Sequence, residues 1–401
     1  MGMPLTVWLP KSFNPLRYVR VTDAAVANYF MGTLVRKTMH EDVDPWGFVR
    51  MHSEILQQEI GYRYAKIIGP LKGAGVYETA GYSVGRHSTG YKLTDRFVND
   101  EFEKRTIHDE VLEERITRAW KERQKSWLPI HHALNDQQQA ITITDKAYTV
   151  IDGLEKRNAQ ICQRALVENI RQRDWHFSVS QFGRVFNAAT GLTQDVRNQV
   201  RLDGNRIGCI DIDCCQPALL SSLLASNRGE DGGNTTLHTC RSALTLPSGW
   251  YGSDVERFRE LSCRGDLYDW LGLRCNPEVK NVKRRVLVDV LAKRGSYQSD
   301  VEDQFRRDFP TVYAAIRFIN RHDHGELIRR LQRLESTLVI ENIAPLLLGR
   351  FPFVTVHDAI YSGVDDLPAV EDAFHETFKE LGFSISLKRE IDGQKTKVTM
   401  K

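Results

Sequence analysis

Two stretches of the chain decide how it must fold: RIGCIDIDCCQPALLSSLL at residues 206–224 and FPFVTVHDAIYSG at residues 351–363. Each contains a short apolar run that ends at an acidic residue, Asp213 in the first and Asp358 in the second. Such runs are typical of buried strands, and Pro217 suits the first turn of a helix that follows its strand directly. Asp358 falls at the tip of a predicted hairpin. Two carboxylates that meet from separate strands form a site for divalent cations.

Asp211 precedes Asp213 by two residues and therefore lies on the same face of the predicted strand. It is an alternative ligand to Asp213. Each aspartate also has a purely structural explanation, because an aspartate at a strand end can cap the next helix and an aspartate suits a tight hairpin turn. The pairing of the two stretches favours metal binding, because each site accounts for the other.

The composition of the 401 residues, 41% hydrophobic and 27% charged, allows a large buried core. The sequence has no apolar run of about 18 residues and no pattern of a secretion signal, so we expect a soluble, cytoplasmic protein without membrane contact. The seven cysteines include no CxxC pair, which argues against a disulfide framework or a zinc ribbon. We assign no site to His238 and Cys240. A net charge of +3 is too small by itself to indicate a nucleic-acid partner.

Helical and strand patterns succeed one another in a way that predicts an α+β fold. The first 175 residues are rich in helical patterns, and short apolar runs from about residue 176 predict strands. The Gly- and Asn-rich stretch at 227–236 is a predicted loop. Helices are expected over 99–124, 155–175, 253–271, 277–293, 301–321 with a restart at Pro310, and 325–348 with a stripe of leucines.

The order of these elements resembles the polymerase half of the family A DNA polymerases, the bacterial DNA polymerase I group. The resemblance extends from about Gly183 to Glu390. Asp213, with Gln216 three residues later and Leu219 in the following helix, is similar to the family's first palm motif, and this spacing favours Asp213 over Asp211. His357 and Asp358 resemble the family's third motif at a hairpin tip. Other segments resemble family landmarks in the expected order: residues 183–204, 266–272, 304–319 and 331–343.

The resemblance implies a right-hand polymerase, with a palm of antiparallel strands backed by helices and with helical fingers. We expect a helix-rich N-terminal, thumb-like or accessory region at 1–175, the palm at 176–252 and 325–401, and the fingers at 253–324. About 175 N-terminal residues are too few for a thumb and a proofreading domain, so we expect proofreading to be absent. The implied activity is that of a monomeric DNA polymerase extending a DNA primer-template with deoxynucleoside triphosphates. Asp213 and Asp358 would be the catalytic residues and would hold two Mg²⁺ ions, which Mn²⁺ can replace.

The same resemblance suggests roles for further residues. Lys283 is the first choice for contact with the triphosphate, followed by Arg284 and by Lys280, which stands four residues before Arg284 on one helix face. Gln216 and Ala218 are expected near the nucleotide. Contacts with nucleic acid are expected from Arg184, Arg197 and Arg201 to phosphates, from Gln332 and Glu335 to the primer terminus, and from His357 in a supporting role. A solvated polar surface is the alternative explanation for these side chains.

Departures from the family pattern leave other functions open. Ala218 stands where the family has a glutamate that excludes ribose, which predicts weak discrimination against ribonucleotides. Ala359 replaces an auxiliary acidic residue, and Arg294 replaces the aromatic residue before Gly295. An RNA polymerase or primase-like enzyme using RNA or ribonucleotides is therefore one alternative, and a catalytically silent nucleic-acid-binding homologue is another. A two-metal nuclease is disfavoured, because no further Glu or His ligands stand near the aspartates in the sequence.

Overall fold

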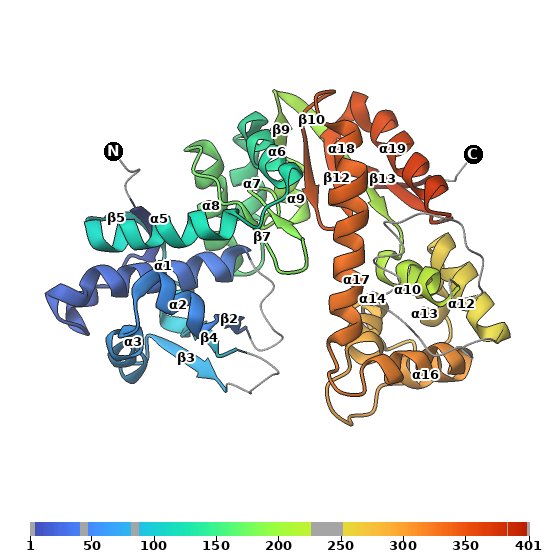
Figure 1. Cartoon of the computed structure of the whole chain (residues 1–401), viewed down its shortest axis with the longest axis horizontal. Coiled ribbons are helices and arrows are strands. Elements are labelled where there is room, and N and C mark those ends of the chain that lie inside the picture. The colour runs from blue at the N-terminus through green and yellow to red at the C-terminus, as the bar shows by residue number, and fades with distance from the viewer. Residues whose placement is uncertain (1–4, 41–46, 82–87, 226–251, 383, 399–401) are drawn as a thin grey trace. The chain divides into compact units, whose positions relative to one another are not determined.

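The computed structural model describes residues 5–40, 47–81, 88–225, 252–382 and 384–398, and its elements are drawn in Figure 1. The predicted loop at 227–236, His238 and Cys240 lie outside the described residues. The chain forms two compact units. The first contains residues 1–132, 141–176 and 188–200, and the second contains residues 133–140, 177–187 and 201–401. Helices and antiparallel sheets occur in both units, so the coarse prediction of an α+β fold is confirmed.

The first unit packs helices against two small antiparallel sheets. Strands β1 (Leu5–Pro10) and β5 (Phe102–Ile107) form one sheet, and β2 (Val49–Arg50), β4 (Gly90–Leu93) and β3 (Tyr77–Ala80) form the other in that order. A short strand, β6, covers Ile141–Ile143. The helices are α1 (Ala24–His40), α2 (Ser53–Ile60), α3 (Tyr64–Gly73), α4 (Asp95–Val98), α5 (Glu110–Gln124), α7 (Lys146–Asp152), α8 (Arg157–Arg171) and α9 (Gln194–Arg197).

One predicted helix of this unit is wrong at its start. The sequence predicts a helix over 99–124, but residues Phe102–Ile107 form strand β5 and α5 begins only at Glu110. Asp109 is the N-cap, since its side chain accepts a hydrogen bond from the Leu112 backbone N–H. Pairing with β1 supplies hydrogen bonds that local periodicity does not reveal. The helix expected over 155–175 is present as α8.

The second unit is built on a sheet with the strand order β11-β12-β10-β13-β14, in which all neighbours are antiparallel. Its long central strand β10 (Asn205–Ile212) lies between the hairpin β11 (Phe353–Val356) and β12 (Ala359–Gly363) on one side and the hairpin β13 (Leu387–Ile391) and β14 (Gln394–Val398) on the other. Both strands predicted around Asp213 and Asp358 are therefore present, and they pair through β12. A separate two-stranded sheet contains β7 (Ser178–Val179) and β8 (Val185–Phe186).

Helices of the second unit follow the predicted pattern closely. The stretch expected at 253–271 is divided into α12 and α13 by Gly265, which takes a left-handed φ of +79°. Pro310 restarts the chain as α16 after α15, as predicted. The bounds are α10 (Cys215–Ala225), α12 (Ser253–Arg264), α13 (Leu267–Gly272), α14 (Val282–Arg285), the π-helix η5 (Val286–Leu291), α15 (Asp300–Asp308), α16 (Pro310–Ile319), α17 (Glu326–Ser336), the π-helix η6 (Thr337–Ile343), α18 (Ala344–Leu347) and α19 (Leu367–Glu380).

Segments α17, η6 and α18 form one long helix, drawn in orange in Figure 1. Its predicted leucine stripe faces the core, because Leu327, Leu331 and Leu338 are at most 1% exposed. The π-helix η6 in the middle interrupts the α-helical hydrogen-bonding pattern between α17 and α18. Such π-helical turns often mark functional sites.

Three elements lie near the junction between the units in the sequence: α6 (Pro129–Gln137), the 3₁₀ turn at Gln138–Ala140 and β9 (Val200–Leu202). β9 continues into β10 through a tight turn in which Leu202 pairs with Asn205.

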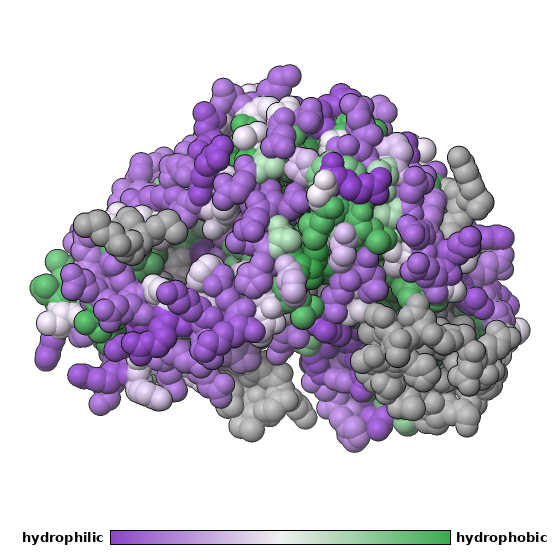
Figure 2. Space-filling view, turned by 45° about the horizontal axis from the view of Figure 1, so that its top comes forward, coloured by the Kyte–Doolittle hydropathy of each residue, from purple (hydrophilic) through white to green (hydrophobic). Residues whose placement is uncertain are grey.

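Hydrophilic residues cover most of the face drawn in Figure 2. In the part of the chain that the structure describes, no helix combines the length and the apolar character that a membrane span requires.

A candidate carboxylate site

The register of the central sheet sets Asp211 next to Asp358. Strand β10 pairs with β12 so that Asp211 lies opposite Ala359, the residue directly after Asp358. His357 and Asp358 form the turn between β11 and β12, and His357 takes a left-handed φ of +56°. Because opposite residues on paired strands have Cβ atoms only about 5 Å apart, the two acidic side chains lie at the same end of the sheet.

The electrostatics of the site agree with this placement. Burial raises the pKa of the Asp211 carboxyl well above its usual range, and the negative charge of Asp358 raises it further. The positive charge of Lys283 acts in the opposite direction, and weaker contributions come from Asp213 and Lys388. The site therefore holds carboxylates that repel one another, with one lysine from the helical region facing them.

Asp213, the first choice of the sequence analysis, has a different environment. Its side chain is 4% exposed and forms an ion pair with Lys388 of β13 at 2.6 Å. Its backbone N–H donates to the carbonyl of Ser386 at 2.9 Å. The turn at Gly265 covers it so closely that a Cβ atom there would lie 2.0 Å from Asp213 Oδ2. The structure thus gives Asp213 a cationic partner and a cover, and it places Asp211, the alternative ligand, beside the hairpin.

Glu335 and Gln216 form a buried network beside the same carboxylates. Glu335 on α17 is 2% exposed and accepts hydrogen bonds from Arg184 Nε at 2.9 Å and Nη2 at 2.8 Å. Burial, followed by the charge of Asp358, raises the pKa of Glu335 to about 7, while Arg184 and a hydrogen bond from Gln216 oppose the rise. The Oε1 atom of Gln216 is buried and has no hydrogen-bond partner within the described residues.

This network changes the interpretation of Arg184 and Glu335, which were both predicted to contact nucleic acid. The two side chains form a bidentate ion pair with each other, so neither is a free surface group. Gln332, one turn earlier on α17, is half-buried.

The aromatic ring of Phe186 at the end of β8 packs edge-on against His357 with ring centroids 6.1 Å apart, and Asn187 donates to the carbonyl of Thr355 at 2.7 Å. The β7–β8 segment therefore supports the hairpin that carries Asp358.

The helix predicted at 277–293, which carries Lys280, Lys283 and Arg284, is shorter than predicted. Helix α14 begins at Val282, and the side chain of its N-cap, Asn281, accepts a hydrogen bond from the Arg284 backbone N–H at 3.1 Å. Lys280 therefore precedes the helix, and the prediction that Lys280 and Arg284 share one helix face is wrong. Lys283 is exposed to solvent at the surface but close enough to Asp211 to oppose the rise in its pKa. Of the three predicted cations, Lys283 is the one that the structure connects with the carboxylates.

The structure gives different environments to three other predicted site residues, Ala218, Arg197 and Arg201. Ala218 is fully buried in α10, so its side chain does not face solvent. Arg197 uses its guanidinium to donate to the backbone carbonyls of Ala189 at 3.1 Å and Leu192 at 2.6 Å within the first unit. Arg201 is half-buried in β9, opposite Arg206.

Tyr268 and Lys388 are site residues that sequence reasoning missed. The Tyr268 backbone N–H donates to the Cys214 thiol, and burial, with contributions from Cys214, Cys215 and Asp358, raises the pKa of the Tyr268 hydroxyl. Lys388 reaches Asp213 from β13. No local pattern signals either residue, because both reach the site only through pairing and packing of distant segments.

Within the described residues, no group of three or more His, Cys, Asp and Glu side chains has the arrangement of a metal centre. Two neighbouring carboxylates nevertheless suit Mg²⁺, which keeps several water ligands and binds through one or two carboxylates together with substrate phosphates. The sequence matches no protein-family model, and no curated protein matches it.

A glycine substitution tests the contact that holds Asp213. We expect Gly265→Ala to lower the unfolding temperature more than Gly349→Ala, because both glycines have a positive φ, +79° and +75°, but only a Cβ at Gly265 meets another side chain within 4 Å. Both variants carry the same backbone strain, on the order of 1–2 kcal/mol. Equal unfolding temperatures for the two variants would show that Asp213 does not pack against this turn.

The buried Glu335 carboxyl makes stability depend on pH. Its pKa of about 7 in the folded chain exceeds the value of about 4.3 expected in the unfolded chain, so the folded state binds more protons between these values. Stability should therefore fall as the pH rises from about 4.5 to about 7, and Glu335→Gln should remove this part of the fall. Urea unfolding of both proteins at pH 5 and pH 8, without divalent cations, measures it. A stability difference between them that is the same at both pH values contradicts the assignment.

Proposed function

We propose that the chain is a template-directed nucleotidyltransferase that extends a primer on a DNA template. The observation that carries the proposal is that the β10–β12 pairing sets Asp211 opposite the residue after Asp358, and that the charges of Asp358 and Lys283 both act on the Asp211 carboxyl. Nucleotidyl transfer needs carboxylates that converge from separate strands and a cation for the triphosphate. The resemblance to the family A polymerases across residues 183–390 supports the same activity.

Asp211 and Asp358 are the residues we assign to hold the divalent cations. Burial and then the negative charge of Asp358 raise the pKa of Asp211, and this environment fits a site that binds positive charge. When bound, Mg²⁺ or Mn²⁺ ions would polarise the reacting phosphate and activate the primer hydroxyl. The negative charge of Asp213 also acts on Asp211, while the ion pair of Asp213 with Lys388 limits its freedom to act as a ligand.

The remaining side chains of the site bind and orient the reactants. Lys283, with Arg284 next to it, is placed to neutralise the triphosphate as charge develops on the leaving pyrophosphate. Gln216 has a buried amide oxygen without a partner in the described structure, which leaves an acceptor for a hydroxyl or amine of the nucleotide. Arg184 and Glu335 hold the neighbouring helix and turn in place and act as positioning residues.

The choice between deoxyribonucleotides and ribonucleotides stays open in this proposal. Ala218 is buried and small, so its side chain cannot exclude a ribose hydroxyl. An RNA polymerase or primase-like activity on the same site is thus the second candidate. Offering each nucleotide type separately, on DNA and RNA templates and with and without a primer, distinguishes the two candidates.

Carboxamide substitutions test which aspartates carry the reaction. We expect Asp358→Asn and Asp211→Asn each to lower Mg²⁺-dependent primer extension by at least about a thousandfold, because each loses a charged cation ligand. Asp213→Asn should retain clearly more activity than either, because Asp213 is paired with Lys388. Asp365→Asn, at an exposed position, is the control. Normal extension by the Asp211 variant together with a dead Asp213 variant would restore the ranking made from the sequence.

A lysine pair tests the position of the triphosphate. Lys283→Ala should raise the KM for the nucleotide by about tenfold or more, whereas Lys280→Ala should change it little, because Lys280 precedes helix α14 and, of these two lysines, Lys283 is the one that acts on Asp211. Steady-state extension kinetics on one primed template measure both. If the two variants have the same KM, Lys283 does not contact the triphosphate.

A further inference from the structure

A cluster of aromatic rings lies on the surface of the first unit. Trp120 in the last turns of α5 is 42% exposed, and its ring lies 6.2 Å from that of Trp127 in an edge-on arrangement. The ring of His132, which is exposed, lies 5.4 Å from that of Trp127. Leu128 beside them is 41% exposed. Large apolar side chains gathered on a surface in this way mark interaction sites.

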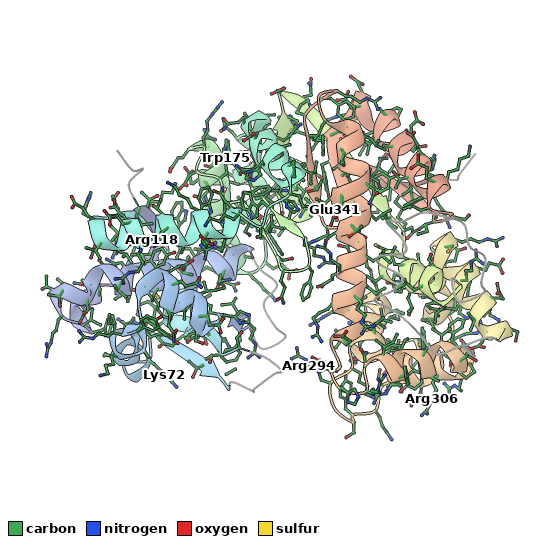
Figure 3. All side chains as sticks on the ribbon, viewed as in Figure 1. Lys72, Arg118, Trp175, Arg294, Arg306 and Glu341 are labelled. Carbon is green, nitrogen blue, oxygen red and sulfur yellow. The ribbon has the colours of Figure 1, made fainter. Side chains whose placement is uncertain are left out.

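Positive charge is concentrated in the second half of α5, the helix that carries Trp120. The acidic residues Glu110, Glu113 and Glu114 lie in the first half of α5, whereas residues 115–125 contain five cations and one acid, Glu122. Two of the cations are engaged, since Arg123 binds Glu59 at 2.6 Å and Lys125 binds Glu122 at 2.5 Å. Arg118 and Lys121 are exposed, and neither forms an ion pair with any described residue. Figure 3 labels Arg118 on α5.

We propose that a surface defined by Trp120, Trp127, His132 and Lys121 forms a binding platform for single-stranded nucleic acid. Arg118, two residues before Trp120, projects from another side of the helix and is not part of the platform. Exposed rings stack on the faces of unpaired bases, and flanking cations attract the phosphates. Base faces are accessible in a single strand but are covered by neighbouring base pairs in a duplex, so the rings favour the single strand. The cations by themselves would suit any polyanion, whereas the combination with rings fits bases joined by phosphates.

The platform does not depend on the proposed polymerase activity. All of its residues belong to the first unit, and the carboxylates belong to the second. Binding through it requires neither a nucleotide nor a divalent cation, so it can be measured in the full-length chain with both left out. A failure of primer extension would therefore leave this proposal untouched, and a failure of strand binding would leave the assignment of the carboxylates untouched.

Fluorescence anisotropy with labelled 20-residue oligomers provides the test. The probes are oligo-dT, oligo-U and an abasic oligomer with the same number of phosphates. Oligo-dT should bind at least about fivefold more tightly than the abasic oligomer, and Trp120→Ala should remove most of this difference, because stacking on an aromatic side chain is worth about that factor or more per base. The oligo-U arm reports whether RNA is accepted equally. Tyr62→Ala, which removes another ring of the same unit that is 87% exposed, is the matched control and should bind as the wild type does.

A charge-reversal variant keeps the test decisive if the tryptophan variant folds poorly. Lys121→Glu alters an exposed side chain only. It should weaken binding of all three oligomers and reduce the slope of log affinity against log salt by about 0.7, the value for one single-strand phosphate contact. Equal affinity of the wild type for oligo-dT and the abasic oligomer would overturn the proposal, and so would unchanged oligo-dT binding in the charge-reversal variant or in a folded Trp120→Ala variant.

Discussion

The antiparallel pairing of β10 with its two neighbours is the constraint on which the second unit depends. Side chains alternate between the faces of a strand, so a slip of one residue would turn Asp211 and Asp213 together to the other face. Gly208 helps to hold the register, because a Cβ at this position would lie 2.8 Å from the carbonyl oxygen of Glu390 and 2.8 Å from Leu367 Cδ1. The close approach of β13 and α19 to β10 therefore requires glycine, and it fixes which residues end beside the hairpin.

Charge in this region is balanced by partners from several elements. Lys388 on β13 neutralises Asp213, Arg184 from the β7–β8 turn neutralises Glu335, and Lys283 at the start of α14 faces Asp211. Buried charges are tolerated only when they are paired and hydrogen-bonded. Asp211 differs from these residues, because after burial the largest influence on the pKa of its carboxyl is the negative charge of Asp358, which exceeds the opposing effect of Lys283. This imbalance is the basis on which we propose Asp211 and Asp358 as the cation ligands.

Much of this arrangement could be predicted from the sequence, because the signals are local. The runs before Asp213 and Asp358 are strands, Pro310 restarts a helix, and the leucines of α17 face the core. Predictions were wrong where pairing partners or caps override periodicity. Residues 102–107 form a strand because β1 is there to pair with them, and α14 starts at Val282 because Asn281 caps it. The preference for Asp213 over Asp211 rested on the spacing to Gln216 in the family motif, and it stays a prediction.

The sequence by itself determined which residues form the strands, the hairpin turn and the long helix, because alternation, helical periodicity, proline and turn chemistry act over a few residues. It also determined that acidic residues end two strands far apart in the chain. Only the tertiary structure decided that Asp211 lies opposite Ala359, that Lys388 and Gly265 enclose Asp213, and that Glu335 pairs with Arg184. Those outcomes depend on strand register and on packing between segments more than 50 residues apart, and short-range patterns carry no information about either.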